Sequence, residues 1–179
     1  LHLGGMYSDG TGVPQNYAEA GKWYRKAAEQ GDTQAQVNLG RIYSRGEGVL
    51  QDFAEAVKWL RKAAEQGNAQ GQLYLGLEYS RSESVHQDYA EAVKWYHKAA
   101  QQGNAHAQYF LGFMYFNGQG VSQDYVQAHL WFNLAAARLS EVDLREQAAE
   151  SRDSLASQMT PRQIAEAQAL AIAWKLKEE

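Results

Sequence analysis

The sequence repeats a Leu-Gly-x-x-Tyr motif at a fixed spacing of 36 residues. The four copies are Leu3-Gly4-Tyr7, Leu39-Gly40-Tyr43, Leu75-Gly76-Tyr79 and Leu111-Gly112-Tyr115. A tryptophan keeps the same phase in each unit, at Trp23, Trp59, Trp95 and Trp131. A fixed period of this length is typical of solenoids, in which each unit buries its apolar face against its neighbours. We therefore expect four similar units, of which the first is truncated.

The unit from Asp32 to Gly67 predicts two helices and two turns. Asp32 precedes a segment with helical periodicity, and its carboxylate can accept hydrogen bonds from the free amides of a helix start. Gly46 follows this segment, and glycine tolerates the left-handed conformation that ends many helices. In the third unit, Ser82 and Ser84 replace the two glycines of this turn. We interpret the replacement either as drift or as a locally altered surface loop.

The periodicity ends after Ala136, and the remaining sequence predicts two further helices over residues 141–158 and 161–177. The second begins at Thr160-Pro161, where threonine can cap a helix and proline suits the first helical position. A solenoid needs such a cap to cover its last apolar face. We expect a repeat array over 1–140 and capping helices over 141–179, together forming one continuous domain.

Composition excludes several classes of function. The formal charge of −4 over 179 residues gives no basic surface for nucleic acid. No apolar run approaches the length of a membrane span. There is no cysteine, which excludes disulfides and thiolate ligands. The chain begins at Leu1, partway along the first expected helix, and we interpret it as a fragment or processed product. Cytoplasm, periplasm and secretion all stay open.

No catalytic, metal or cofactor site is predicted. The five histidines show no metal-ligand spacing. Glu19, Glu55 and Glu91 recur in phase near helix starts, so we interpret them as helix caps and not as an acid–base pair. We expect a protein that is not an enzyme and that needs no cofactor.

The repeat unit resembles the Sel-one-like repeat, a branch of the tetratricopeptide superfamily. The resemblance spans residues 1–136 and rests on the following residues of the second unit: Ala35, Leu39, Gly40, Tyr43, Gly46, Gly48, Val49, Asp52, Ala56, Trp59, Lys62, Ala63, Ala64 and Gly67. It implies an all-α, right-handed solenoid of antiparallel helix pairs that serves as an adaptor or scaffold. It also implies that the first helices of the units line a concave groove, and that the protein is bacterial.

The first helices differ from one another at positions outside the repeated pattern. These positions change from basic and polar in the second unit to aromatic in the fourth. The candidate partner-binding residues are Val37, Arg41, Arg45, Leu73, Leu77, Arg81, Tyr109, Phe113 and Phe116. Exposed aromatic residues and arginines are typical of sites that bind a peptide. The alternative is that Tyr109, Phe113 and Phe116 are covered by the last helices, through Leu144, Leu155 or Trp174.

The sequence therefore predicts a non-catalytic module that binds a partner protein or peptide in its groove, as a monomer or weak homo-oligomer. One alternative is a scaffold that self-associates through its repeats. Another is a regulatory subunit of an envelope-associated enzyme complex. The sequence names no partner.

Overall fold

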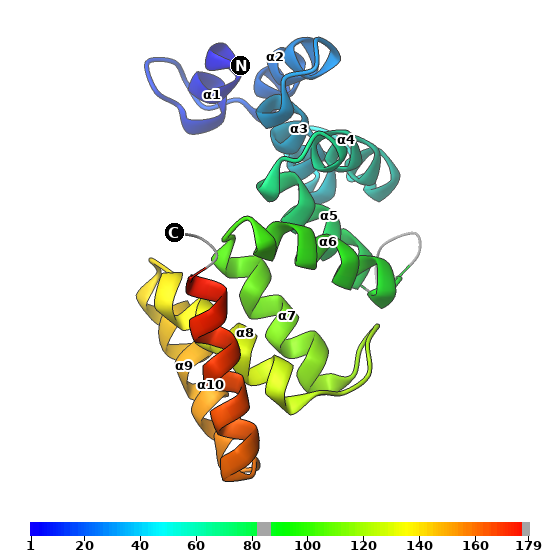
Figure 1. The fold of residues 1–179 in the computed structure, drawn as a ribbon. Helices are drawn as coiled ribbons and strands as arrows, with labels where there is room; N and C mark the ends of the chain where they lie inside the picture. The colour runs from blue at the N-terminus through cyan, green and yellow to red at the C-terminus, as the bar shows by residue number, and fades with distance from the viewer. Residues whose placement is uncertain (82–86, 177–179) are drawn as a thin grey trace. The chain divides into compact units, whose positions relative to one another are not determined.

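The computed structural model describes residues 1–81 and 87–176 (Figure 1). Within these residues it is entirely helical and contains no strand, as the sequence predicted. The helices are α1 (His2–Asp9), α2 (Tyr17–Glu29), α3 (Thr33–Arg45), α4 (Phe53–Glu65), α5 (Ala69–Ser80), α6 (Tyr89–Gln101), α7 (Ala105–Asn117), α8 (Tyr125–Arg138), α9 (Val142–Ala156) and α10 (Pro161–Lys175). The predicted turn at Ser82 and Ser84 lies outside the described residues.

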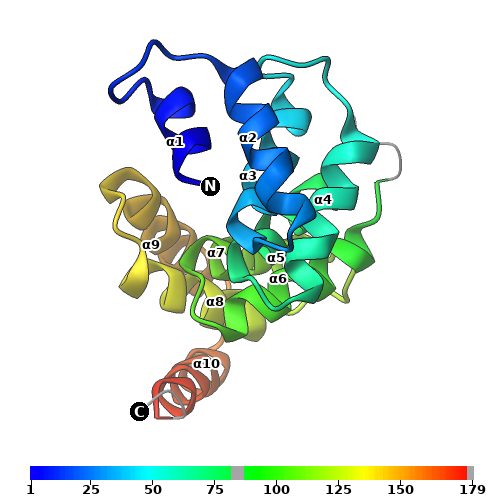
Figure 2. The ribbon, with the colours of Figure 1, turned by 90° about the horizontal axis from the view of Figure 1, so that it is seen from above.

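The helices group into two compact units. Unit 1 spans Leu1–Asp88 and holds α1 to α5, and unit 2 spans Tyr89–Glu179 and holds α6 to α10. Within unit 1 each helix packs on the next along the chain (Figure 2). The continuity of the repeat array and cap as a single domain stays a prediction.

The helix boundaries follow from local chemistry. The Asp32 carboxylate accepts a hydrogen bond of 2.7 Å from the backbone amide of Ala35, which caps α3 as predicted. The helix ends at Gly46, whose φ of 69° is left-handed. Asp52 and Asp124 cap α4 and α8 in the same manner. The repeated aspartates and glycines therefore set where the helices start and stop.

The glycine of the Leu-Gly motif permits close packing of the two helices in one repeat. A Cβ atom on Gly40 would lie 2.6 Å from the Cγ atom of Leu60, which is too close for any real contact. Gly48 has both a left-handed φ of 71° and a close neighbour, since its Cβ would lie 2.4 Å from the Ala18 amide nitrogen. These glycines are required by the backbone approach and not only by helix termination.

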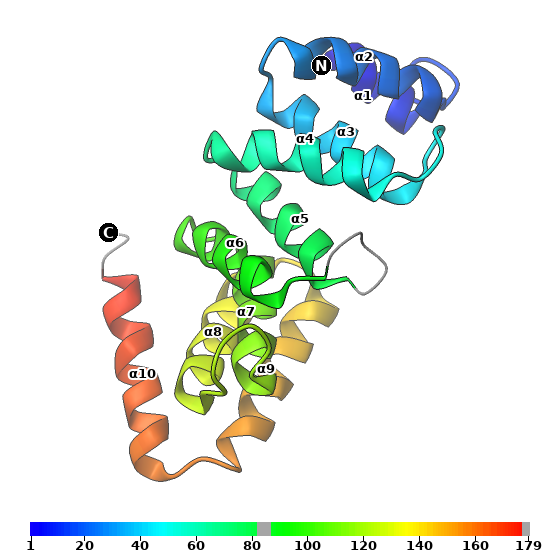
Figure 3. The same ribbon diagram turned by 90° about the vertical axis from the view of Figure 1, so that its right-hand side faces the viewer.

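In unit 2, the two helices predicted after the repeats are present as α9 and α10, and both pack on α8. Figure 3 shows α8 between α9 and α10. Leu155 of α9 and Ala171 of α10 are buried, and the rings of Trp131 and Trp174 meet at 4.9 Å between centroids. Thr160 forms a full capping box with Gln163 at the start of α10. In the described part of the chain, no helix is long and apolar enough to cross a membrane.

Candidate functional site

The predicted site residues of unit 1 lie on α3 and α5, but they do not all reach the surface. Val37 is 0% exposed and Leu73 is 6% exposed, so both belong to the core. The expectation that these two residues line an open groove is corrected, because both side chains are buried. Arg41, Arg45, Leu77 and Arg81 stay at least partly accessible.

Arg41 lies across the ring of Tyr74, and this contact joins α3 to α5. Its guanidinium carbon is 5.1 Å from the ring centroid, within the range of a cation–π interaction. The Nε atom of Arg41 is buried and has no hydrogen-bond partner among the described residues.

A second contact between α3 and α5 involves a buried carboxylate. Glu78 is only 3% exposed, and its Oε1 accepts a hydrogen bond of 2.6 Å from the Ser44 hydroxyl. Arg81 donates to the Ser44 Oγ at 3.1 Å and lies 3.5 Å from Glu78 Oε1. The other carboxylate oxygen of Glu78 is buried without a partner in the described part of the chain. Ser44 therefore links Glu78 to Arg81 across the two helices.

We call the accessible set formed by Arg41, Arg45, Tyr74, Leu77 and Arg81 the α3–α5 surface. Arg45 is exposed and lies 3.4 Å from Glu47, a pair that solvent screens. Leu77 is half-buried. The α3–α5 surface thus presents three arginines around one aromatic ring and one aliphatic side chain.

Two cavities lie beside α2, with volumes of about 570 and 590 Å³. The larger one lies between α1 and α2 and also reaches α3. The cavity beside α1 has a volume of about 590 Å³ and is lined by Leu1, His2, Gly5, Met6, Asp9, Thr11, Tyr24, Gln34 and Asn38. Burial raises the pKa of the Tyr24 hydroxyl, which hydrogen-bonds with Ser8 and Asn38 and lies near the charges of Asp9 and Arg41.

In unit 2, the predicted aromatic residues are partly covered by the protein's own last helices. Tyr109, Phe113 and Phe116 pack against a buried cluster that includes Leu155 of α9. The Tyr109 hydroxyl also donates to Gln147 Oε1 of α9 at 3.3 Å. The expectation of a fully exposed aromatic patch is therefore corrected, in favour of the covering alternative. Leu155 provides the cover, whereas Trp174 packs on Trp131.

These aromatic rings also pack on one another. Phe113 makes edge-on contacts with Tyr109 and Phe132, with centroids 4.9 and 5.1 Å apart. A small cavity of about 310 Å³ remains beside them, lined by Phe113, Phe116, Phe132, Glu150, Ser151, Ser154 and Leu155. The aromatic set therefore acts mainly as the packing layer between α7, α8 and α9.

Two residues of the site were not singled out from the sequence. Glu78 occupies a position at which the second and fourth units have Ile42 and Met114, so a polar residue at an apolar repeat position was the available signal. Tyr74 replaces Asn38 of the preceding unit. Its contact with Arg41 depends on how α3 and α5 pack, which the repeat pattern does not report.

The site offers hydrogen-bond donors, positive charge and an aromatic face. No group of three or more potential metal-ligating His, Cys, Asp or Glu side chains occurs among the residues that the structure describes. An arginine that stacks on a tyrosine is an arrangement suited to recognition of a partner's carboxylate or carbonyl groups.

Comparisons with known proteins place the chain in a family. A Sel1 repeat model matches residues 1–32, 33–68, 69–104 and 105–138. A search of curated proteins finds no match. Among solved structures, the chain is similar to a Sel1 repeat protein from Oxalobacter formigenes, with 31% identity and a TM-score of 0.71 over 89% of this chain and 72% of the other. It is also similar to the cysteine rich protein B of Helicobacter pylori, with 25% identity and a TM-score of 0.53 over 69% of this chain and 87% of the other. With its four matched repeats and this helical fold, the chain belongs to the Sel1 repeat family.

Proposed function

We propose that the α3–α5 surface binds a partner protein through an exposed peptide segment. Sel1 repeat proteins are generally protein-interaction modules, and the family is generally non-catalytic. The observation that carries the proposal is the contact of Arg41 with the Tyr74 ring, in which both side chains stay partly accessible. Arginine and tyrosine are enriched among the residues that dominate binding energies at protein interfaces.

The chemistry of the surface indicates the kind of segment. Arg41, Arg45 and Arg81 supply positive charge, and the Tyr74 ring and Leu77 supply apolar area. Glu47 pairs with Arg45 and Glu78 pairs with Arg81, so three arginines against two carboxylates leave one net positive charge at this surface. A segment that combines an acidic side chain with an apolar one would match this arrangement.

The test is a peptide selection followed by affinity measurement. Peptides are selected from a random displayed library on the immobilised wild-type protein, and their affinities are measured by fluorescence anisotropy. We expect Arg41→Ala to weaken binding at least about tenfold, because truncating an arginine that dominates an interface costs about 2 kcal/mol or more and about 1.4 kcal/mol is tenfold.

The matched control is Arg162→Ala, which removes the same charge from the exposed start of α10 in unit 2. The control should retain wild-type affinity. Selected peptides that are enriched in acidic and apolar residues and that discriminate between the two variants support the proposal. Peptides that bind both variants equally would argue against the α3–α5 surface.

Self-association is the second candidate, and α10 carries the observation that favours it. Ile172 and Leu176 are exposed and lie four residues apart, so they occupy neighbouring places along one face of the helix. Analytical ultracentrifugation over a wide concentration range tests it. A dimer that is lost in Ile172→Glu would support self-association, whereas a monomer at all concentrations would exclude it.

A further inference from the structure

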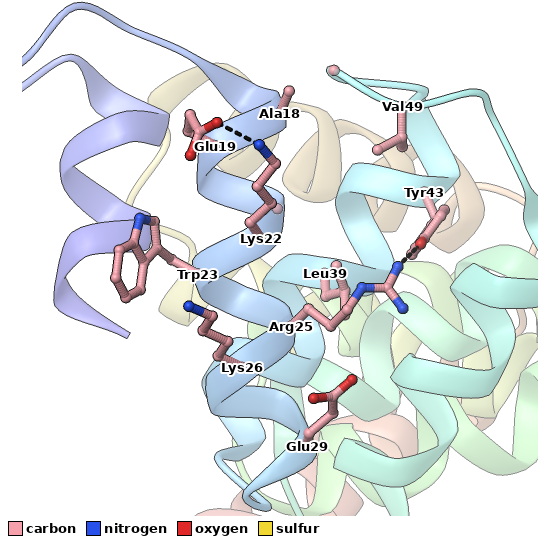
Figure 4. A pocket seen from close by; sticks show the side chains of 12 residues that line it. Ala18, Glu19, Lys22, Trp23, Arg25, Lys26, Glu29, Leu39, Tyr43 and Val49 are labelled. Atoms are coloured by element: carbon pink, nitrogen blue, oxygen red, sulfur yellow. Dashed lines mark hydrogen bonds and ion pairs between the residues drawn. The ribbon is translucent and has the colours of Figure 1, made fainter.

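The second cavity beside α2 lies away from the α3–α5 surface and shares no residue with it. It has a volume of about 570 Å³ and opens between α2, α3 and the turn that follows α3 (Figure 4). Its lining residues are Ala18, Glu19, Gly21, Lys22, Trp23, Arg25, Lys26, Glu29, Leu39, Tyr43, Gly48 and Val49. Cavities of this size are typical of sites for small molecules.

Among the lining residues, Gly21 is the one that differs from the residues at the same position in both of the following repeats. The corresponding position is Val57 in the second unit and Val93 in the third. A Cβ atom on Gly21 would come no closer than 3.9 Å to any heavy atom outside its immediate neighbours, the nearest being Ile42 Cδ1. The packing therefore does not require glycine here, unlike at Gly40. A glycine inside a helix is also unfavourable, so its main structural effect is to leave space.

The lining combines an apolar part with a charged rim. Gly21, Leu39 and Val49 supply the apolar part. Three cations and two carboxylates lie around it, which leaves a net positive charge; the cations are Lys22, Arg25 and Lys26, and the carboxylates are Glu19 and Glu29.

Each cation already has a structural contact. Lys22 lies 2.6 Å from Glu19, Lys26 lies 4.6 Å from the Trp23 ring centroid, and Arg25 donates to the Tyr43 hydroxyl (Figure 4). The next repeat reproduces these contacts, since Lys58 pairs with Glu55 and Lys62 stacks on Trp59. The rim alone therefore indicates no ligand, and the added feature in the first repeat is the space at Gly21.

We propose that this cavity is a binding site for a small aromatic or branched aliphatic anion. The apolar body of the ligand lies against Gly21, Leu39 and Val49, in the space left at the position that is valine in the next two repeats. Its acidic group faces Lys22 and Lys26, whose ammonium groups are at the solvent-exposed rim. This site is independent of peptide binding at the α3–α5 surface.

The test fills the cavity and measures binding of a defined probe. The probe is 8-anilinonaphthalene-1-sulfonate, which has aromatic rings and one negative charge and becomes fluorescent in apolar surroundings. We expect Gly21→Val to weaken its binding at least about tenfold while the melting temperature stays the same or rises, since valine is the better helix former. A loss of binding with intact folding separates a filled cavity from a damaged protein.

The control is Gly5→Val in α1, where a Cβ atom would also meet no atom within 4 Å. This variant makes the same substitution beside the other cavity, the one next to α1, and outside the proposed site, so it should bind the probe as the wild type does. Equal loss in both variants, unchanged affinity in Gly21→Val, or no binding by the wild type would each overturn the proposal.

A second arm tests the charge. N-phenyl-1-naphthylamine has the same rings without the sulfonate. In the double variant Lys22→Gln/Lys26→Gln, affinity for the anionic probe should fall about threefold or more, as expected for exposed charges, with the neutral probe unaffected. An equal effect on both probes would overturn the assignment of the acidic group to these lysines.

Discussion

Arg41 in unit 1 and Phe113 in unit 2 occupy the same position of the repeat, yet they have opposite roles. Arg41 lies over one tyrosine ring at the accessible α3–α5 surface. Phe113 meets two aromatic rings and packs beside Leu155 of α9. The difference shows that one repeat position can serve as surface or as packing layer, depending on whether another helix of the same unit covers it.

The neighbouring position shows the same contrast. Glu78 in unit 1 is a buried carboxylate held by Ser44, whereas the equivalent Met114 in unit 2 is a buried apolar residue. At this position unit 1 therefore has a hydrogen-bonded carboxylate where unit 2 has an apolar side chain. Three measurements test this difference between the two units.

The largest effect is expected from Leu155→Ala, which removes the side chain that covers the aromatic residues of unit 2. Leu155 is 1% exposed, so we expect the free energy of unfolding to fall by about 2–5 kcal/mol. Urea unfolding followed by far-UV circular dichroism measures the change. The matched control is Leu50→Ala, at a leucine that is 91% exposed, and it should have almost no effect. If the two variants were equally stable, α9 would not be the cover that the structure shows.

A smaller effect, of opposite sign, is expected from Glu78→Met. This variant places in unit 1 the residue that unit 2 has at the same position, and it removes a buried carboxylate with one oxygen unpaired in the described structure. We expect a gain of about 1 kcal/mol in the free energy of unfolding, because the cost of burying the carboxylate is removed, while Arg81 is exposed enough to be solvated and still donates to Ser44.

Glu78→Gln is the control for this variant, because it keeps the shape and an acceptor for Ser44 while it removes the charge. Its stability should lie between those of the wild type and Glu78→Met. A marked loss of stability in Glu78→Met would show instead that the link through Ser44 to Arg81 is needed for folding of unit 1.

The smallest effect is an acid-dependent loss of stability in unit 2. Burial lowers the pKa of His129, and the positive charge of Arg152 lowers it further, against a smaller opposite influence of Asp153. Burial also lowers the pKa of His97. Both imidazoles bind protons more weakly in the folded protein than in the unfolded chain. Their full contribution to the free energy of unfolding is therefore present above the unfolded pKa of 6.5, and it is lost as the pH falls below 6.5 toward the lower pKa of the folded state.

We therefore expect the urea midpoint to fall between pH 7.5 and pH 5.5, and to fall less in His129→Gln. We expect this pH sensitivity in unit 2, because the two described histidines with a lowered pKa, His97 and His129, both lie there. An identical pH dependence in wild type and variant would contradict the assignment to His129.

Much of the fold could be predicted from the sequence because the determinants are local. Asp32 caps α3 and Gly46 ends it through contacts within a few residues, so sequence spacing alone reports them. Thr160 and Pro161 likewise predict the start of α10. The site was predicted less well. Val37 was expected at the surface and is buried, and Glu78 was overlooked although its place in the repeat is apolar elsewhere.

The sequence by itself determined the helices, their turns and membership of a repeat family, since a strict period repeats the same short-range signals. Only the tertiary structure decided which side chains of those helices are accessible. The partial cover of Phe113 by Leu155, the contact of Arg41 with Tyr74 and the space left by Gly21 all depend on how close neighbouring helices approach. That approach is set by the volumes of side chains distant in the sequence, which no local pattern specifies.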